Sequence, residues 1–173
     1  MIGHINVHET GAIENTGHKV LAINAPNGKI TAKQIKETCD NYINDEKKEH
    51  IVQPGMVYIS QPTENGLLYR KEELEELYGV CKEYDIPLYI DGARLGYGMM
   101  SPQNDMYMSD IAENCDVFYI GGTKIGALFG EAVVITNNKF KQDFRYNMKQ
   151  KGGMLAKGRI LGIQFCELFS TWQ

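Results

Sequence analysis

Apolar positions in this chain fall into short runs that alternate with longer amphipathic stretches. Short apolar and β-branched runs bounded by Gly, Pro, Asn or Asp predict strands. Stretches in which apolar residues recur every three or four positions predict helices. We expect strands at residues 19–25, 56–60, 88–91, 116–120 and 131–135, and helices from 31 to about 45 and at 71–84, 139–150 and 158–169, with one or two helical turns at 109–113.

The starts of the first two helices carry recognisable signals. Thr31 and Gln34 have the spacing of a capping box, in which each side chain binds the backbone N–H of the other residue. Four glutamates lie near the start of the helix at 71–84, where the positive end of the helix dipole favours acids. These residues are therefore assigned a structural role.

The order of the elements predicts an α/β fold with a mostly parallel sheet flanked by helices. Strands alternate with helices, and the connections are too long for hairpins, so right-handed parallel crossovers are expected. The carboxyl ends of parallel strands meet at one edge of a sheet, where α/β proteins bind ligands. The loop at residues 63–65, the acid Asp91 and the amine Lys124 are predicted to lie at that edge.

A carboxylate and an amine at the same sheet edge suit pyridoxal phosphate. This cofactor bonds covalently to a lysine, and an acid pairs with its pyridine nitrogen. Asp91 and Lys124 fit these two roles. Each residue alone is a weak signal, because an Asp-Gly pair after a strand is more often a plain turn and a lysine after two glycines is more often a surface residue.

Composition and charge exclude several other classes of protein. The net charge of −4 and the absence of a basic cluster with aromatics argue against a nucleic-acid surface. No run of about 18 apolar residues is present, so no membrane partner is expected. The four cysteines are widely spaced, which predicts reduced thiols in a cytoplasmic protein. His4 and His8 lack a third ligand at matching spacing, so no metal site is expected.

Three motifs carry a resemblance to a known family. The segment Ile90-Asp91-Gly92-Ala93-Arg94-Leu95 resembles the IDGAR motif of the threonine aldolases, in the beta-eliminating lyase group of fold-type I pyridoxal-phosphate enzymes. Gly122-Thr123-Lys124 falls where that family has the lysine that binds the cofactor, and Gly3-His4-Ile5 falls where it has a histidine that stacks on the ring. The similarity extends over essentially all 173 residues.

The resemblance implies a role for each matching residue. Five would bind the cofactor: Lys124 covalently, Asp91 at the pyridine nitrogen, Ala93 beneath the ring, His4 stacked on it, and Thr123 near the phosphate. Arg94 would hold the substrate carboxylate through two charge-assisted hydrogen bonds. The implied reaction cleaves a β-hydroxy amino acid, threonine or allo-threonine, to glycine and an aldehyde.

Two departures from the family pattern leave alternatives open. Glu64 stands where the family usually has the histidine that handles the proton of the β-hydroxyl, which admits transamination or β-elimination as the reaction. Catalytic roles are accordingly expected for Lys124, His4 and Glu64.

A nucleotide-binding α/β domain is less consistent with the sequence, because Gly96-Tyr97-Gly98 lacks the third glycine of a dinucleotide motif and opens no clear helix.

The second departure is length, since 173 residues are roughly half of what the family needs. We expect residues 1–173 to form a single partial large domain, without the amino-terminal phosphate-loop segment and the carboxyl-terminal small domain. Such a fragment is a candidate for an inactive form of the enzyme. The family resemblance further implies that the full-length protein is a homodimer or homotetramer.

Overall fold

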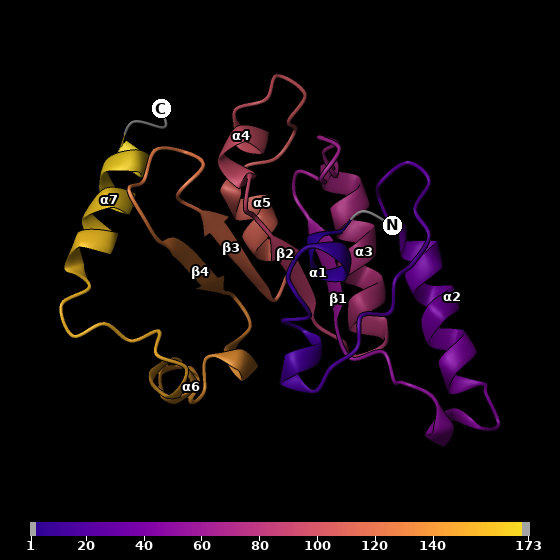
Figure 1. Cartoon of the computed structure of the whole chain (residues 1–173). Coiled ribbons are helices and arrows are strands. Elements are labelled where there is room, and N and C mark those ends of the chain that lie inside the picture. Colours follow the sequence, from indigo (N-terminus) through magenta and orange to yellow (C-terminus); the bar gives the residue numbers. More distant parts are fainter. Residues whose placement is uncertain (1–2, 171–173) are drawn as a thin grey trace.

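The chain folds around one four-stranded sheet (Figure 1). The computed structural model describes residues 3–170. The strands are β1 Val57–Ser60, β2 Leu88–Asp91, β3 Val117–Gly121 and β4 Glu131–Ile135, and they lie in the sheet in that order. β1, β2 and β3 are parallel to one another, and β4 is antiparallel to β3. The mostly parallel α/β fold predicted from the sequence is therefore confirmed.

Seven α-helices and three short 3-10 helices are present among the described residues. The α-helices are α1 His4–Val7, α2 Ala32–Ile43, α3 Lys71–Glu83, α4 Leu95–Met99, α5 Met108–Glu113, α6 Phe144–Gln150 and α7 Arg159–Ser170. The 3-10 helices are η1 Glu14–Thr16, η2 Lys48–His50 and η3 Asn138–Phe140. Figure 1 shows α2 on the outer side of α3, beyond β1, whereas α6 and α7 lie on the side of β4.

One face of the sheet forms the core. Alternate strand residues point to opposite faces, and those of one face are buried together with side chains of α2, α3, α4 and α5. The strand residues concerned are Val57, Ile59, Leu88, Ile90, Phe118 and Ile120. The opposite face carries Tyr58, Tyr89 and Tyr119, which are half-buried. The two faces of the sheet therefore differ in chemistry, with a buried apolar side and a tyrosine side.

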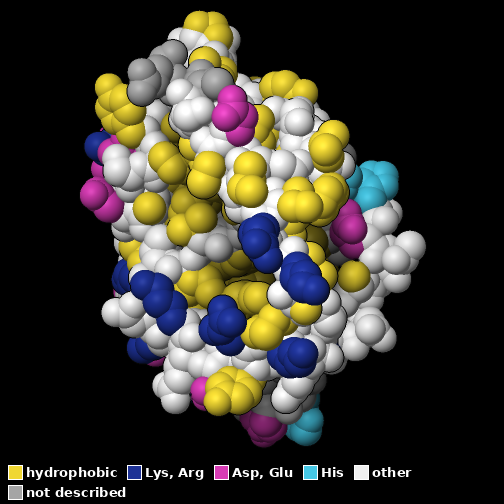
Figure 2. Space-filling model, turned by 90° about the vertical axis from the view of Figure 1, so that its left-hand side faces the viewer, with side chains coloured by type: hydrophobic (Ala, Val, Ile, Leu, Met, Phe, Trp, Pro, Cys, Tyr) yellow, Lys and Arg dark blue, Asp and Glu magenta, His cyan; other side chains and the backbone are white. Residues whose placement is uncertain are grey.

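The fully buried residues of the core end before the last third of the chain, where partly buried side chains such as Ala132, Val134 and Phe165 pack against them. None of the described residues from 123 onward is buried. Several large apolar side chains are widely exposed there, including Leu128 at 85%, Tyr146 at 71% and Ile163 at 62%. Figure 2 shows this side of the molecule, where apolar side chains gather in the centre with lysines and arginines around them.

Polar contacts hold the ends of the elements. The predicted capping box is present, with Gln34 N donating to Thr31 Oγ at 3.3 Å and Thr31 N donating to Gln34 Oε1 at 3.0 Å. At the amino end of β3, the buried Asp116 carboxylate accepts hydrogen bonds from Lys82 at 2.9 Å, from Asn137 at 2.7 Å and from the Leu88 amide at 2.8 Å. The Asp116 contacts lie at the edge of the sheet opposite to the predicted site.

Three expectations about secondary structure are wrong. Residues 19–25 form no strand, because alternation identifies an extended segment but not a hydrogen-bonding partner. The helix expected at 139–150 is divided into η3 and α6 by Asp143, whose φ of 56° lies in the left-handed region. A short helix, α4, does form over Gly96 and Gly98, where no helix was expected.

Candidate active site

The carboxyl end of β2 presents a nearly buried carboxylate. Asp91 is the last residue of the strand and is 8% exposed. Its Oδ1 atom accepts a hydrogen bond from Ala93 N at 2.9 Å, and its Oδ2 atom accepts one from the Tyr58 hydroxyl. Backbone contacts fix the same residue, since Gln61 N donates to the Asp91 carbonyl at 2.9 Å. The strand end is therefore tied to both the 61–66 loop and β1.

Backbone packing between the ends of β2 and β3 leaves no room for side chains. Gly121 N donates a hydrogen bond to the Gly92 carbonyl at 2.9 Å. A Cβ atom at Gly92 would lie 1.8 Å from the Tyr119 carbonyl oxygen, and one at Gly121 would lie 2.3 Å from the Ala93 carbonyl oxygen. The turn that carries Asp91 and Ala93 is thereby held directly against the end of β3.

Thr123 and Lys124 lie in the tight turn that follows β3. The Gly122 carbonyl accepts hydrogen bonds from Ile125 N at 3.1 Å and Ala127 N at 3.0 Å, which close the turn. Glu131 on β4 accepts from Gly122 N at 2.7 Å and from the Thr123 hydroxyl at 3.2 Å. The Lys124 side chain is exposed, and within residues 3–170 its amine has no hydrogen-bond or ion-pair partner. This amine is accordingly available to a ligand.

Glu64 lies in the loop after β1 and is oriented by two donors. Its Oε1 atom accepts hydrogen bonds from Ser60 Oγ at 3.0 Å and from His4 N at 3.2 Å. The structure thus brings α1 and its His4 against the loop that carries Glu64, although the two residues are 60 positions apart. The His4 ring itself contacts Glu9 at 3.1 Å and lies 4.9 Å from the His8 ring, measured between centroids.

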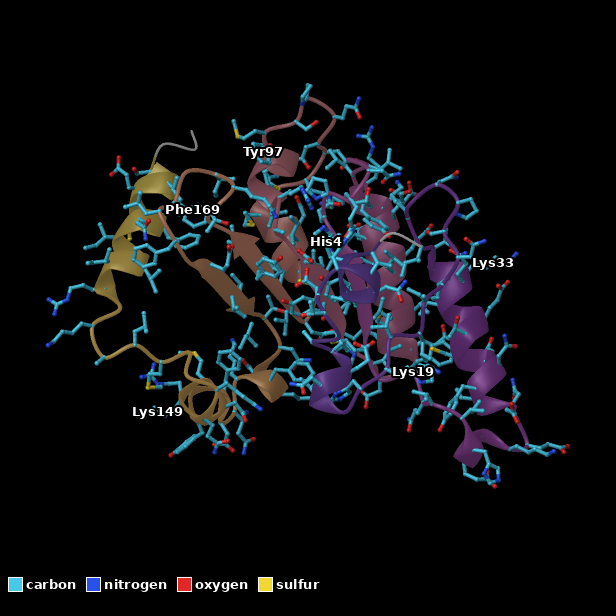
Figure 3. All side chains as sticks on the ribbon, viewed as in Figure 1. His4, Lys19, Lys33, Tyr97, Lys149 and Phe169 are labelled. Carbon is cyan, nitrogen blue, oxygen red and sulfur yellow. The ribbon has the colours of Figure 1, made fainter. Side chains whose placement is uncertain are left out.

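A cleft of about 260 Å³ lies between the 62–68 loop and the α4 region. Glu64 and the half-buried Arg94 both line it, together with Tyr97 on α4. Figure 3 shows Tyr97 at the outer end of the molecule and His4 near its centre. A guanidinium and a carboxylate in one cleft can bind the carboxylate of a small ligand and accept a proton from the same ligand.

The structure brings together most of the predicted site residues at one edge of the sheet. Asp91, Ala93 and the turn with Thr123 and Lys124 follow neighbouring strands, whereas Glu64 and Arg94 share the adjacent cleft. Among residues 3–170, no group of three or more His, Cys, Asp or Glu side chains is placed to hold a metal ion.

Sequence reasoning missed the hydroxyl groups on the tyrosine side of the sheet. Tyr58 binds Asp91, and Ser60 binds Glu64, so β1 contacts both carboxylates. Burial first, and then the hydrogen bond to Asp91, raise the pKa of Tyr58 well above its usual value, and the pKa of Tyr119 is raised by the same two causes. The sequence did hold a signal for hydroxyl groups near the site, because Tyr89 and Tyr119 each lie two residues before the end of a strand.

Comparisons with known proteins give a consistent result. Residues 2–166 match the family model described as beta-eliminating lyase. The chain is 34% identical to the low specificity L-threonine aldolase of Pseudomonas sp. (strain NCIMB 10558) over 95% of its own length and 47% of that protein. It is 32% identical to the low specificity L-threonine aldolase of Pseudomonas aeruginosa over 91% of its length and 45% of that protein.

Among solved structures, the threonine aldolase of Leishmania major is similar to this chain. The TM-score is 0.87 and the identity is 48%, over 94% of this chain and 46% of the other. A second solved structure, cystalysin from Treponema denticola, has a TM-score of 0.64 at 16% identity, a likeness in fold alone. The chain thus spans about half the length of the curated relatives that it matches.

Proposed function

Because this chain belongs to the beta-eliminating lyase family, we propose that it forms the cofactor-binding core of a pyridoxal-phosphate lyase of the threonine aldolase type. The proposed reaction cleaves a β-hydroxy amino acid, such as threonine or allo-threonine, to glycine and an aldehyde. Similar proteins named as L-threonine aldolase and as threonine aldolase support this choice. The observation that carries the proposal is the backbone contact that holds the Asp91 turn against the strand leading to Lys124.

The residues present fit pyridoxal phosphate by their chemistry. Lys124 offers an exposed amine, and Asp91 offers a nearly buried carboxylate one strand away. We assign Lys124 to the covalent bond with the cofactor, Asp91 to its ring nitrogen, Ala93 to the space beneath the ring, His4 to the stacking face and Thr123 to the phosphate. When bound, the cofactor supplies an electron sink for the electron pair that remains on Cα after C–C cleavage.

Two residues of the cleft act on the substrate. The Arg94 guanidinium binds the substrate carboxylate, because its planar fork donates two parallel hydrogen bonds. Glu64 acts as the base for the β-hydroxyl group. Its Oε1 atom is occupied by Ser60 and the His4 amide, whereas Oε2 has no partner within residues 3–170. As the Cα–Cβ bond breaks, Oε2 takes the hydroxyl proton, Cβ leaves with its substituents as the aldehyde, and a proton added to the electron pair left on Cα gives glycine.

Assembly and location form the broader part of the proposal. We place residues 1–173 within a single partial large domain, in a protein that forms homodimers or homotetramers. The exposed apolar side chains beyond β4 support a contact with further protein on that side (Figure 2). A cytoplasmic location is supported by the four cysteines, all of which are free. No helix within residues 3–170 is both long enough and apolar enough to span a membrane.

The test of the cofactor assignment uses absorbance. Pyridoxal 5′-phosphate added to the chain is expected to produce a band near the visible edge that Lys124→Ala abolishes. Lys33→Ala is the matched control, because Lys33 is 85% exposed on α2 and far from the site (Figure 3). A band that survives Lys124→Ala, or that Lys33→Ala also removes, would contradict the assignment.

The test of the reaction compares products. Aldehyde release from L-threonine and L-allo-threonine is expected, with no keto acid. Glu64→Gln keeps the size of the side chain but removes its basicity, so we expect aldehyde release to fall by about 10² to 10⁴-fold while the absorbance band remains. Keto acid in place of the aldehyde would indicate transamination, and ammonia release with keto acid would indicate β-elimination.

A further inference from the structure

The Asp91 carboxylate is held by two different parts of the fold. The Tyr58 hydroxyl on β1 donates a hydrogen bond to Oδ2, and the Ala93 amide in the following turn donates one to Oδ1. In the parallel register Tyr58 faces Tyr89 and Ser60 faces Asp91, so Tyr58 reaches its partner diagonally across the sheet. With one oxygen fixed by a neighbouring strand and the other by its own turn, the plane of the carboxylate cannot rotate freely.

The Tyr58 hydroxyl acts as a donor in this contact. Burial, followed by the hydrogen bond to Asp91, raises the pKa of the phenol far above its usual range. Tyr58 therefore stays protonated at neutral pH, and its proton needs an acceptor. A carboxylate has about four acceptor positions, so Tyr58, the Ala93 amide and Tyr119, whose pKa a hydrogen bond to Asp91 also raises, leave room for one further hydrogen bond from a ligand.

We propose that Tyr58 is a positioning residue, whose hydroxyl holds the Asp91 carboxylate in the orientation that pairs with the ring nitrogen of pyridoxal phosphate. This inference rests on the proposed function, because it takes Asp91 as the partner of the ring. It assigns part of the cofactor affinity to a residue of β1, a strand that lies outside the motifs on which the family resemblance depends. Tyr58 itself makes no contact with the cofactor in this scheme.

Tyr89 lies between Tyr58 and Tyr119 on the same face of the sheet and provides a matched comparison. Its ring stacks on that of Tyr58 at 5.4 Å between centroids, and it is tilted against Tyr119 at 6.4 Å. Burial raises the pKa of Tyr89 to about 12, with a smaller effect from the charge of Asp91. Its hydroxyl makes no hydrogen bond to any of the residues 3–170. Tyr89→Phe thus removes a hydroxyl from the same surface without touching the carboxylate.

The first experiment measures the affinity of the chain for pyridoxal 5′-phosphate by absorbance titration. Tyr58→Phe is expected to weaken binding about 10-fold, the effect of losing one hydrogen bond to a charged group. Tyr89→Phe is expected to stay within about twofold of the unaltered chain, the scatter of sites that do not interact. Equal losses in the two variants would overturn the proposal.

The second experiment separates positioning from a general structural role. In an Asp91→Ala background, Tyr58→Phe should cause no further loss of affinity, because the group that Tyr58 holds is already gone. A loss of the same factor in both backgrounds would show that Tyr58 acts through packing and would refute the inference. The midpoint of urea unfolding, measured for the unaltered chain and for all four variants, verifies that each variant is folded under the titration conditions.

The outcomes also distinguish this inference from the proposed function. A band that depends on Lys124, together with equal affinity of Tyr58→Phe and Tyr89→Phe, refutes the positioning role and leaves the proposed function standing. Failure of the unaltered chain to give any band that depends on Lys124 refutes both.

Discussion

The glycine that follows Asp91 offers the sharpest test of how the fold holds the site. A Cβ atom at Gly92 would lie 1.8 Å from the Tyr119 carbonyl oxygen, 3.0 Å from its carbon and 3.1 Å from Leu95 Cβ. Two of these neighbours are backbone atoms of β3, which cannot rotate away as a side chain would. In Gly92→Ala, the ends of β2 and β3 must therefore separate.

The size of the effect follows from the geometry. The contact must lengthen by roughly 1.2 Å before it reaches 3.0 Å, the limit that real Cβ atoms respect. A shift of that size also breaks the hydrogen bond from Gly121 N to the Gly92 carbonyl, which is 2.9 Å long. Overpacking costs about 1–3 kcal/mol and the lost hydrogen bond about 1 kcal/mol, so we expect a loss of about 3 kcal/mol in the free energy of unfolding.

The assay is urea unfolding followed by circular dichroism. With a slope of about 2 kcal/mol per molar urea, Gly92→Ala should lower the midpoint by about 1.5 M. Gly79→Ala is the matched control, because Gly79 lies inside α3 with nothing within 4 Å of its Cβ position. This control should raise stability by about 0.5–1 kcal/mol through helix propensity. A Gly92→Ala chain as stable as the unaltered one would refute the close contact between the strands.

Two further predictions concern the edge of the sheet opposite to the site and the start of α2. Burial opposes ionisation of Asp116, but hydrogen bonds from Lys82, Asn137 and the Leu88 amide outweigh it and hold the pKa of Asp116 below its usual value. Its stabilising effect is therefore complete above the ordinary carboxyl pKa of about 4 and is lost as the pH falls through the lower folded value. Asp116→Asn should lower the free energy of unfolding by about 3 kcal/mol at pH 7, and this free energy should then fall less in acid than it does in the unaltered chain. Urea unfolding across pH measures both effects, and an unchanged fall in acid would contradict this explanation. Thr31→Ala should lower the unfolding free energy by about 1 kcal/mol, because it removes the acceptor for Gln34 N at the start of α2; an unchanged midpoint would contradict the cap.

The strands that position the site could be predicted because local and global signals agree there. The run that ends in Asp91 and the run that ends in Gly121 are apolar, short and bounded by glycine, and both form strands at nearly the expected residues. Residues 19–25 alternate in polarity just as clearly but form no strand, because a strand also needs a partner with free backbone groups. Periodicity reports which side chains are buried, whereas pairing depends on the whole fold.

The hydroxyl partners of the carboxylates could not be predicted, since they depend on register. Tyr58 reaches Asp91 only because Val57 lies opposite Leu88 in the sheet. A shift of one residue would turn Tyr58 into the core and would bring Ile59 to the face that carries Asp91. Parallel strands joined by a helix carry no local signal that fixes this register. The sequence therefore identifies the two carboxylates, but the structure is needed to find the groups that orient them.

The Asp91-Gly92-Ala93 segment combines two separate physical requirements in three residues. Asp91 supplies the charge, and its orientation depends on donors from β1 and from the Ala93 amide. Gly92 and the facing Gly121 carry no chemistry, but their lack of a Cβ atom lets β2 and β3 approach closely enough to bring the charge beside the turn of Lys124. Substitution of Asp91 should therefore impair cofactor binding in a folded chain, whereas substitution of Gly92 should impair folding first. Within this one motif, Asp91 is therefore needed for cofactor binding, and Gly92 is needed for the close approach of β2 and β3.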